Sequence, residues 1–289
     1  MHAPDACADS ALAALKQPRL QALHTWPLPQ RQGLLGVFTD IDDTLTEHGS
    51  ITPDALQALH DLRSAGLHVV AITGRPIGWC APLANGDAAS GLPAWPVDAV
   101  VAENGAVAWV GPPGEREKIY QQNANTRARN RARMRAVGER IERQVAGARI
   151  TRDSAGRETD LAIDHAEFAR LSPEQIAQVV AIMQAEGMHT TVSSIHTHGC
   201  FGLFNKWQGA LWIAQQLWGR SLPAELERWV CVGDSGNDVA MFEHFIHSVG
   251  VANIQRVAPG LSHLPRYMTT SERGTGFAEA AAAILAARA

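Results

Sequence analysis

Continuous apolar stretches recur along the chain and predict strands that are buried on both faces of a sheet. They span residues 34–40, 67–73, 97–103, 228–234 and 247–253. Apolar residues at helical spacing lie between them, as in the helix that is predicted to begin at Pro53 and to end before Gly66. Helices that alternate with buried strands are typical of a parallel sheet. We therefore expect a doubly wound, Rossmann-like α/β domain.

A different pattern occupies the middle of the chain, after the segment 111–114. An Arg-rich polar stretch predicts a long helix at 124–146, and an amphipathic helix follows at 173–186. The segments 159–164 and 188–194 instead alternate apolar and polar residues, which is typical of strands with one solvated face. These features predict an antiparallel α+β module that is inserted into the first domain.

The two patterns divide the chain into an α/β core and an inserted cap. The core is predicted to comprise residues 32–113 and 197–289, and the cap residues 114–196. Residues 1–31 hold four prolines and no sustained amphipathic repeat, so we expect an N-terminal tail there, with a short helix near Ser10–Lys16.

The composition argues against nucleic acid and membranes as partners. The chain has 289 residues with 25 Lys and Arg, 29 Asp and Glu, and a formal net charge of −4. Five arginines between Arg127 and Arg135 do not form one basic stripe, because helical spacing spreads them over several faces. A solvated cap helix is the first interpretation of this run, and steering of an anionic substrate is the second.

Location and redox state follow from what the sequence contains near its N-terminus and from its cysteines. No apolar run approaches the roughly 18 residues of a membrane span, and no Lys or Arg precedes the first short apolar patch as in a secretory signal. The four cysteines are far apart and suggest neither a zinc site nor disulfides. We expect a cytoplasmic protein.

Polar residues follow three of the predicted parallel strands. Asp40 and Asp42 follow the first, Thr73, Gly74 and Arg75 the second, and Asp234 and Asp238 a later one. The carboxyl ends of parallel strands share one edge, so the four carboxylates are expected to converge, and like charges that close require a cation. An all-oxygen site favours Mg²⁺, which prefers phosphate as a further ligand. Lys206, at a predicted helix start, would complete a phosphoryl receptor.

In this order the segments resemble the four motifs of the haloacid dehalogenase superfamily of phosphohydrolases. The matches are DxDxT at Asp40–Thr44, the strand-end Thr73, Lys206 in FNKWQGAL, and GDSGND at 233–238. The turn at 103–106 and the position of the insert resemble subfamily IIB, whose larger α/β cap occurs in sucrose-phosphate and trehalose-phosphate phosphatases. The resemblance covers about residues 34–287 and is thin in the cap. One departure is Asp43, where the family usually has Gly.

The resemblance implies a role for each matching residue. Asp40 would be the nucleophile that forms an aspartyl-phosphate, and Asp42 the general acid and base. Mg²⁺ would be held by Asp40, the backbone carbonyl of Asp42, Asp234 and Asp238. The phosphate would be bound by Thr73, Gly74 and Lys206.

Further residues near the same sheet edge are candidates for substrate contacts. They are Arg75, Asn104, Ser193, Ser194, His196 and Asn237. An ion pair at the rim is the alternative for Arg75, and orientation of the loop is the alternative for Asn237. A metal site at His196 and His198 is disfavoured, because the sequence offers no third ligand nearby.

We therefore expect a Mg²⁺-dependent phosphoric monoester hydrolase that acts on a small phosphorylated metabolite, with a sugar phosphate favoured. A phosphomutase or phosphotransferase on the same scaffold stays open, as does a binding protein without turnover. Opening of the cap predicts hinges near Pro112–Pro113 and at His196–Gly199. The sequence leaves open which substrate is used, the oligomeric state, the role of residues 1–31 and the effect of Asp43.

Overall fold

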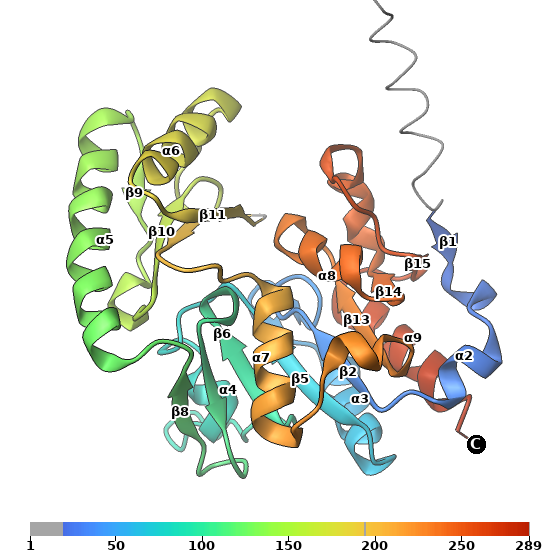
Figure 1. Cartoon of the computed structure of the whole chain (residues 1–289). Coiled ribbons are helices and arrows are strands. Elements are labelled where there is room, and N and C mark those ends of the chain that lie inside the picture. The colour runs from blue at the N-terminus through green and yellow to red at the C-terminus, as the bar shows by residue number, and fades with distance from the viewer. Residues whose placement is uncertain (1–19, 194, 289) are drawn as a thin grey trace, which may run out of the picture.

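A nine-stranded sheet forms the centre of the molecule (Figure 1). The computed structural model describes residues 20–193 and 195–288, and these contain all the elements discussed below. In spatial order the strands are β1 (Gln21–Ala22), β15 (Tyr267–Met268), β14 (His247–Gly250), β13 (Trp229–Gly233), β2 (Gly36–Thr39), β5 (His68–Ile72), β6 (Ala99–Ala102), β7 (Val107–Val110) and β8 (Glu117–Tyr120). The strands from β1 to β6 in this order run parallel, and β7 and β8 are antiparallel. The predicted α/β fold class is confirmed.

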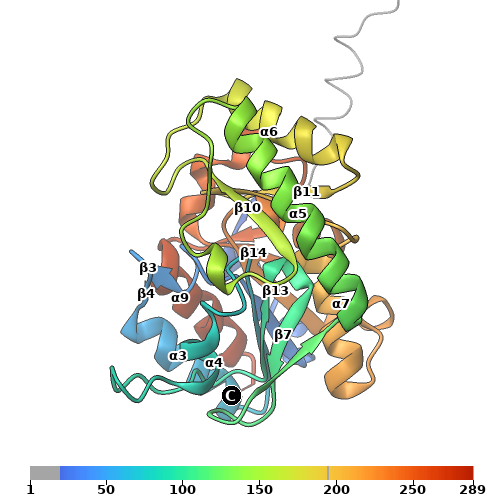
Figure 2. The same cartoon turned by 90° about the vertical axis from the view of Figure 1, so that its left-hand side faces the viewer.

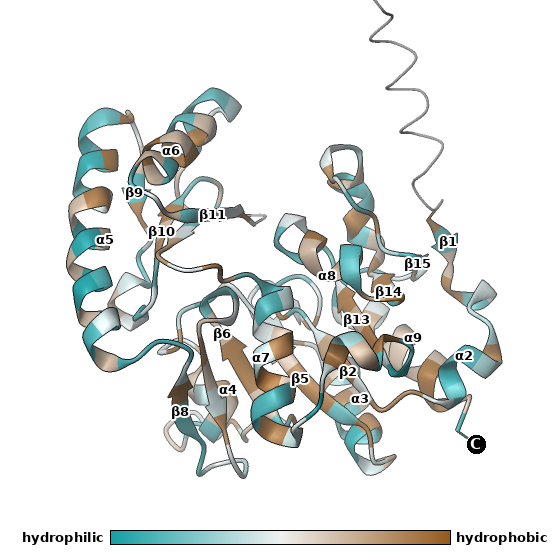
Figure 3. Ribbon diagram, in the orientation of Figure 1, coloured by the Kyte–Doolittle hydropathy of each residue, from teal (hydrophilic) through white to brown (hydrophobic). Residues whose placement is uncertain are grey.

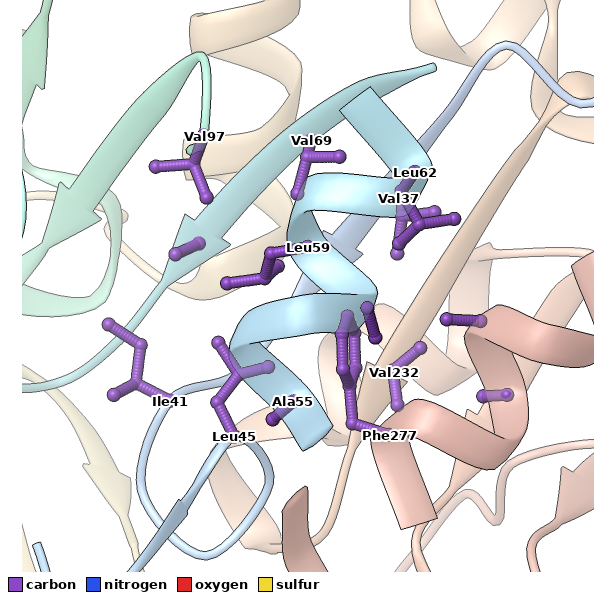
Figure 4. Close-up of a cluster of buried hydrophobic side chains, with 14 of the residues drawn as sticks. Val37, Ile41, Leu45, Ala55, Leu59, Leu62, Val69, Val97, Val232 and Phe277 are labelled. Carbon is purple, nitrogen blue, oxygen red and sulfur yellow. The ribbon is translucent and has the colours of Figure 1, made fainter. Parts of the chain in front are cut away.

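Alternate residues of the central strands enter two separate hydrophobic clusters. Val37 and Val69 pack on one face with helices α3 (Pro53–Ser64) and α9 (Arg273–Leu285), as the close-up in Figure 4 shows. Phe38 and other residues pack on the opposite face with α7 (Lys206–Trp218) and α8 (Val239–His244). Because both faces are covered, the strands read as continuous apolar runs, and Figure 3 shows them as the most hydrophobic part of the core.

Shorter elements complete the core. They are α2 (Leu28–Gln32), α4 (Ala81–Asn85) and a hairpin of β3 (Thr46–Glu47) and β4 (Ser50–Ile51). Local signals fix where the long helices begin: the Thr52 side chain accepts from the backbone N–H of Ala55 at the start of α3, and Asn205 accepts from Gln208 at the start of α7.

A four-stranded antiparallel sheet with two helices forms the second part of the molecule. Its strands are ordered β11 (His189–Val192), β12 (His196–Cys200), β10 (Asp160–Asp164) and β9 (Arg149–Ile150). Helices α5 (Ala124–Gln144) and α6 (Pro173–Ala185) cover one face (Figure 2) and share a hydrophobic cluster with β10. Strand β10 is buried along its whole length, so the predicted solvated face is wrong for this strand. Its other face lies against the core.

The sheets do not divide the chain where the sequence pattern placed the boundaries. Strand β8 falls inside the predicted cap, 114–196, yet pairs with β7 in the core sheet. Strand β12 continues the smaller sheet to Cys200, beyond the predicted boundary. The predicted hinge at His196–Gly199 therefore lies within a paired strand. The links between the two sheets are residues 121–123 and 201–205, and the hinges, like the division into domains, remain predictions.

The N-terminal segment is folded from residue 21 onward, which corrects the expectation of a tail through residue 31. Strand β1 pairs with β15, and the indole of Trp26 is buried and stacks on Tyr267 with ring centroids 5.3 Å apart. The sequence did not reveal this because β1 is two residues long and has no periodicity. The predicted helix at Ser10–Lys16 lies outside the described residues. No helix in the described part of the chain is long and apolar enough to cross a membrane.

Replacing the Trp26 side chain tests whether this segment belongs to the folded core. We expect Trp26→Ala to lower the free energy of unfolding by about 3–5 kcal/mol, because a large buried ring is removed. The measurement is equilibrium denaturation by urea. His24→Ala, at an exposed position two residues away, is the control and should change stability by less than about 0.5 kcal/mol. Equal midpoints for the Trp26 variant and the unaltered protein would contradict this packing.

Candidate active site

Three of the polar residues predicted to act together follow neighbouring parallel strands at one edge of the sheet, and so does Glu103, which the sequence analysis did not single out. Asp40 follows β2, Thr73 follows β5, Glu103 follows β6 and Asp234 follows β13. Strands β13, β2, β5 and β6 are adjacent and parallel, so their carboxyl ends lie side by side. The edge faces the smaller sheet (Figure 1). Ligands of open α/β sheets bind at such an edge.

Three buried carboxylates form the centre of the site. Asp40, Asp234 and Asp238 each offer an oxygen within 4.8 Å of the others. Burial raises the pKa of Asp40 to about 7, and burial together with Asp40 raises that of Asp234 well above its usual value. Carboxylates this close and this buried are stable in their charged form only beside a cation, and their oxygen-only chemistry could hold Mg²⁺.

Lys206 supplies positive charge to the same cluster. Its ammonium Nζ is fully buried, 2.5 Å from Asp40 Oδ1 and 2.6 Å from Asp238 Oδ1. Although burial opposes the charged form, the carboxylates of Asp238 and Asp40 raise the pKa of Lys206 above its usual value. The lysine is therefore charged and positioned next to the Asp40 carboxylate.

The GDSGND segment folds around the carboxylate of Asp238. Its Oδ2 accepts from the backbone N–H groups of Asp234 and Ser235, at 3.0 and 3.1 Å. A Cβ on Gly233 would stand 2.4 Å from the Asp238 Cγ, so only glycine fits there. Both oxygens of Asp238 are thus engaged by protein donors, and this residue orients Lys206 and the Asp234 loop.

Asn253 is a site residue that the sequence analysis missed. Its Nδ2 donates to Asp234 Oδ2 at 2.9 Å and to the backbone carbonyl of Asp43 at 3.0 Å, which ties the two acidic loops together. The backbone N–H of Arg273 donates to its Oδ1 at 3.0 Å and fixes the amide. No motif marked Asn253, because it lies in a short 3₁₀ segment far from the other site residues in sequence.

Asp43, the departure from the family pattern, occupies a position suited to glycine. Its backbone φ is +55°, in the left-handed region that Gly adopts most readily and Asp tolerates. Its carboxylate lies 3.0 Å from Arg273 Nε. Asp43 is not among the three carboxylates of the cluster.

Asp42 is not among the clustered carboxylates and is bound by Arg75. The guanidinium makes a two-pronged contact, with Nε 3.0 Å from Asp42 Oδ2 and Nη2 3.0 Å from Asp42 Oδ1. Arg75 Nη1 also lies 3.4 Å from Oε1 of Glu167, in the loop between β10 and α6. The guanidinium carbon of Arg75 lies 5.0 Å from the centroid of the Trp79 ring. The side chain of Asp42 is therefore not a metal ligand in this conformation, and Arg75 forms the rim ion pair that was its alternative interpretation.

A pocket at the sheet edge collects most of the predicted residues. Those lining it are Asp40, Asp42, Thr73, Gly74, Arg75, Ser193, His196 and Asn237, together with Ile195, His198 and Ser235. His196 is buried and its Nε2 lies 2.8 Å from Glu167 Oε2. Ser194 lies outside the described residues. Asn104 does not line this pocket, but its amide lies beside Gly74.

Glu103 joins the core to the smaller sheet. Its fully buried carboxylate accepts from the backbone N–H of Ile77 in the core, from those of residues 158–160, and from the Thr159 hydroxyl. Burial raises the pKa of Glu103 to about 7. Nearby, Arg157 Nη1 donates to the carbonyl of Gly74 at 2.9 Å. The smaller sheet is therefore held over the pocket by several buried polar contacts.

Two models of known protein families match separate segments of the chain. A family model described as haloacid dehalogenase-like hydrolase matches residues 37–144, and a model described as sucrose-6F-phosphate phosphohydrolase matches residues 205–282. These two segments contain Asp40, Thr73, Lys206 and Asp234 at the motif positions. Over these two segments the chain is similar to the haloacid dehalogenase superfamily. No curated protein matches the chain.

Solved structures share the fold of this chain at low sequence identity. The sucrose-phosphatase from Synechocystis sp. PCC6803, solved with sucrose and phosphate, has a TM-score of 0.63 at 18% identity and covers 86% of this chain and 97% of its own. A Thermoplasma acidophilum protein, 0175, has a TM-score of 0.64 at 16% identity, with coverages of 87% and 98%. The subclass IIB sugar phosphatase BT4131 has a TM-score of 0.57 at 16% identity, with coverages of 86% and 96%.

Glu103 offers a test of the contact between the two sheets. Glu103→Gln places an amide NH₂ where backbone N–H donors converge, so we expect the free energy of unfolding to fall by about 2–4 kcal/mol. Urea denaturation measures the effect. Glu117→Gln, at an exposed position, is the matched control and should be within about 0.5 kcal/mol of the unaltered protein. A free energy of unfolding in Glu103→Gln that equals that of Glu117→Gln would contradict a stabilising role for the Glu103 contacts.

Proposed function

We propose that this protein is a Mg²⁺-dependent phosphatase that hydrolyses a small phosphate monoester, favouring a sugar phosphate, through an aspartyl-phosphate. The observation that carries the proposal is the buried Lys206 ammonium between Asp40 and Asp238, at the edge of a pocket lined by Asp40, Asp42 and Thr73. A nucleophilic carboxylate and charged groups for phosphate oxygens thus occupy one place. The fold shared with sugar phosphatases supports the choice of substrate class.

The first displacement uses Asp40 as nucleophile. Lys206 occupies Oδ1 of Asp40, and the other oxygen attacks phosphorus to form a P–O bond while the ester P–O bond breaks. Asp42 gives a proton to the departing alcohol oxygen. Lys206, Thr73 and the backbone at Gly74 stabilise charge on the phosphoryl oxygens.

The second displacement returns the enzyme to its starting state. Asp42 takes a proton from water, which attacks phosphorus, and the bond to Asp40 breaks to release inorganic phosphate. For both steps Asp42 must leave Arg75, which holds its carboxylate at 3.0 Å. We propose that substrate binding draws Arg75 away, because the arginine already has alternative partners in Glu167 and Asp153.

The residues present fit a bound Mg²⁺. Asp40 and Asp234, with the backbone carbonyl of Asp42, would hold the ion, and Asp238 would keep the Asp234 loop in place. When bound, the ion neutralises negative charge on the carboxylates and on the phosphoryl group. Burial and the neighbouring Asp40 raise the pKa of Asp234, and a nearby cation would act in the opposite direction.

Asparagine at position 40 tests the proposed nucleophile. We expect Asp40→Asn to lower the rate of p-nitrophenyl phosphate hydrolysis with Mg²⁺ by at least about 10³-fold, because an amide cannot form the phosphoenzyme. Asp43→Asn is the control, since this nearby carboxylate lies outside the cluster, and it should stay within about threefold of the unaltered enzyme. Equal rates for Asp40→Asn and the unaltered protein would eliminate the assignment. Free phosphate from a single sugar phosphate distinguishes hydrolysis from isomerisation by a mutase.

Asn253 offers a test of the metal site that leaves the nucleophile intact. We expect EDTA to abolish phosphatase activity and Mg²⁺ to restore it. Asn253→Ala should raise the Mg²⁺ concentration for half-maximal activity by about 10–100-fold, because the amide that orients Asp234 is lost. Gln255→Ala, at an exposed position two residues away, should leave the Mg²⁺ dependence unchanged. An unchanged Mg²⁺ requirement in Asn253→Ala would contradict the proposal that Asn253 orients Asp234 as a metal ligand.

A further inference from the structure

His198 is a pocket residue to which the sequence analysis gave no role. It lies on β12 of the smaller sheet, is 3% exposed, and lines the pocket that also holds Asp40 and Asp42. Its Nε2 would stand 3.2 Å from a Cβ placed on Gly74, so this nitrogen lies directly beside the proposed phosphate-binding loop. Nε2 makes no hydrogen bond to the described residues, whereas Nδ1 lies 2.9 Å from Asp160 Oδ2.

Asp160 fixes which ring nitrogen of His198 carries the proton. Its other oxygen, Oδ1, accepts from Arg157 Nη1 at 2.7 Å. Although burial acts in the opposite direction, Arg157 and His198 lower the pKa of Asp160, so its carboxylate is ionised. An ionised carboxylate accepts hydrogen bonds, and Nδ1 of His198 must therefore be the protonated nitrogen. Burial lowers the pKa of the imidazole, which is neutral, and Nε2 is left as a bare acceptor.

The side-chain amide of Asn104 lies next to Nε2. The Asn104 Oδ1 atom is buried and has no hydrogen-bond partner, and it would stand 3.2 Å from the same Cβ on Gly74. Asn104 is held there by a backbone φ of +54° and by its N–H, which donates to the carbonyl of Thr73 at 3.0 Å. The Asn104 amide nitrogen would stand 3.3 Å from that Cβ as well, so this amide brings a donor and an acceptor beside Nε2. Nε2 of His198, which lines the pocket, is the acceptor that a donor from outside the protein can reach.

The groups around the pocket limit which chemical group of a substrate can be that donor. A substrate carboxylate is disfavoured at this position, because an ionised carboxylate only accepts hydrogen bonds and would leave Nε2 of His198 unpaired. Lys206, the nearest buried ammonium, is already bound to two aspartates. An ammonium donor is disfavoured because the Arg157 guanidinium lies beside His198 and carries the same charge. The remaining common donor is a neutral hydroxyl.

We propose that His198 accepts a hydrogen bond from a hydroxyl group of the leaving group, and so selects polyhydroxylated phosphate esters over phosphorylated acids. Asp160 is the positioning residue that turns the imidazole lone pair toward the pocket. The inference rests on the proposed function, and it names the leaving group's chemistry, which the catalytic residues do not decide. It also assigns a task to the smaller sheet, because His198 and Asp160 both belong to it.

The first experiment compares substrates with the unaltered enzyme. Hexose phosphates and disaccharide phosphates should be hydrolysed with a higher kcat/KM than 3-phosphoglycerate. For the best sugar phosphate, at least one monodeoxy analogue should lose about tenfold or more in kcat/KM. A preference for 3-phosphoglycerate, or monodeoxy analogues all within threefold of the parent sugar, would overturn the proposal without any variant being made.

The second experiment assigns the effect to His198. His198→Ala should lower kcat/KM for the best sugar phosphate by about 10–100-fold and leave p-nitrophenyl phosphate, which has no such hydroxyls, within about threefold. The deoxy substitution that harms the unaltered enzyme should cost this variant nothing more. His198→Gln, whose side-chain carbonyl can accept in place of Nε2, should recover at least part of the loss.

Thr197→Val is the matched control. Its side chain is buried on the neighbouring position of the same strand and points to the opposite face of the sheet, so neither substrate should be affected. Equal losses on both substrates in His198→Ala and His198→Gln would overturn the proposal, as would no loss on either. Failure of the proposed function is a separate outcome: Asp40→Asn would then retain p-nitrophenyl phosphate hydrolysis.

Discussion

The contact between the Lys206 ammonium and the carboxylates of Asp40 and Asp238 is the constraint on which this site depends. All three groups are buried, and a charge in such a place is stable only when it is paired. Lys206 neutralises part of the negative charge and leaves a remainder on Asp234 and Asp40. A divalent cation bound to these two carboxylates would offset the remaining negative charge and that of a phosphoryl group. The ion pairs that let these charges be buried are therefore the same contacts that the proposed chemistry uses.

The parallel sheet makes this contact possible. Asp40 and Asp234 are 194 residues apart in the chain, yet they follow the adjacent strands β2 and β13. The strands are fixed by apolar packing on both faces, so the loops after them have little freedom. Small residues then allow close approach: Gly233 makes room for the carboxylate of Asp238, and Gly74 for Asn104 and His198. Asn253 connects the two acidic loops directly.

The smaller sheet contributes a second set of buried charges over the same edge. Glu103 of the core binds backbone N–H groups at 158–160, and Arg157 returns a bond to Gly74. Asp160 lies between Arg157 and His198. The interface that holds the two sheets together thus also orients a pocket residue, which makes closure and recognition of the leaving group parts of one network in the proposed enzyme.

The sequence by itself determined the α/β fold class and the polar residues at the carboxyl edge of its sheet, because buried strands and strand-end acids are local patterns. It also marked Lys206 correctly as the first residue of α7. Only the tertiary structure decided what depends on distant pairing: that β8 joins the core sheet, that Trp26 packs on Tyr267, and that Arg75 holds Asp42. Asn253 and His198 were missed for the same reason. Their roles come from neighbours far away in the chain, and no periodicity or motif encodes such contacts.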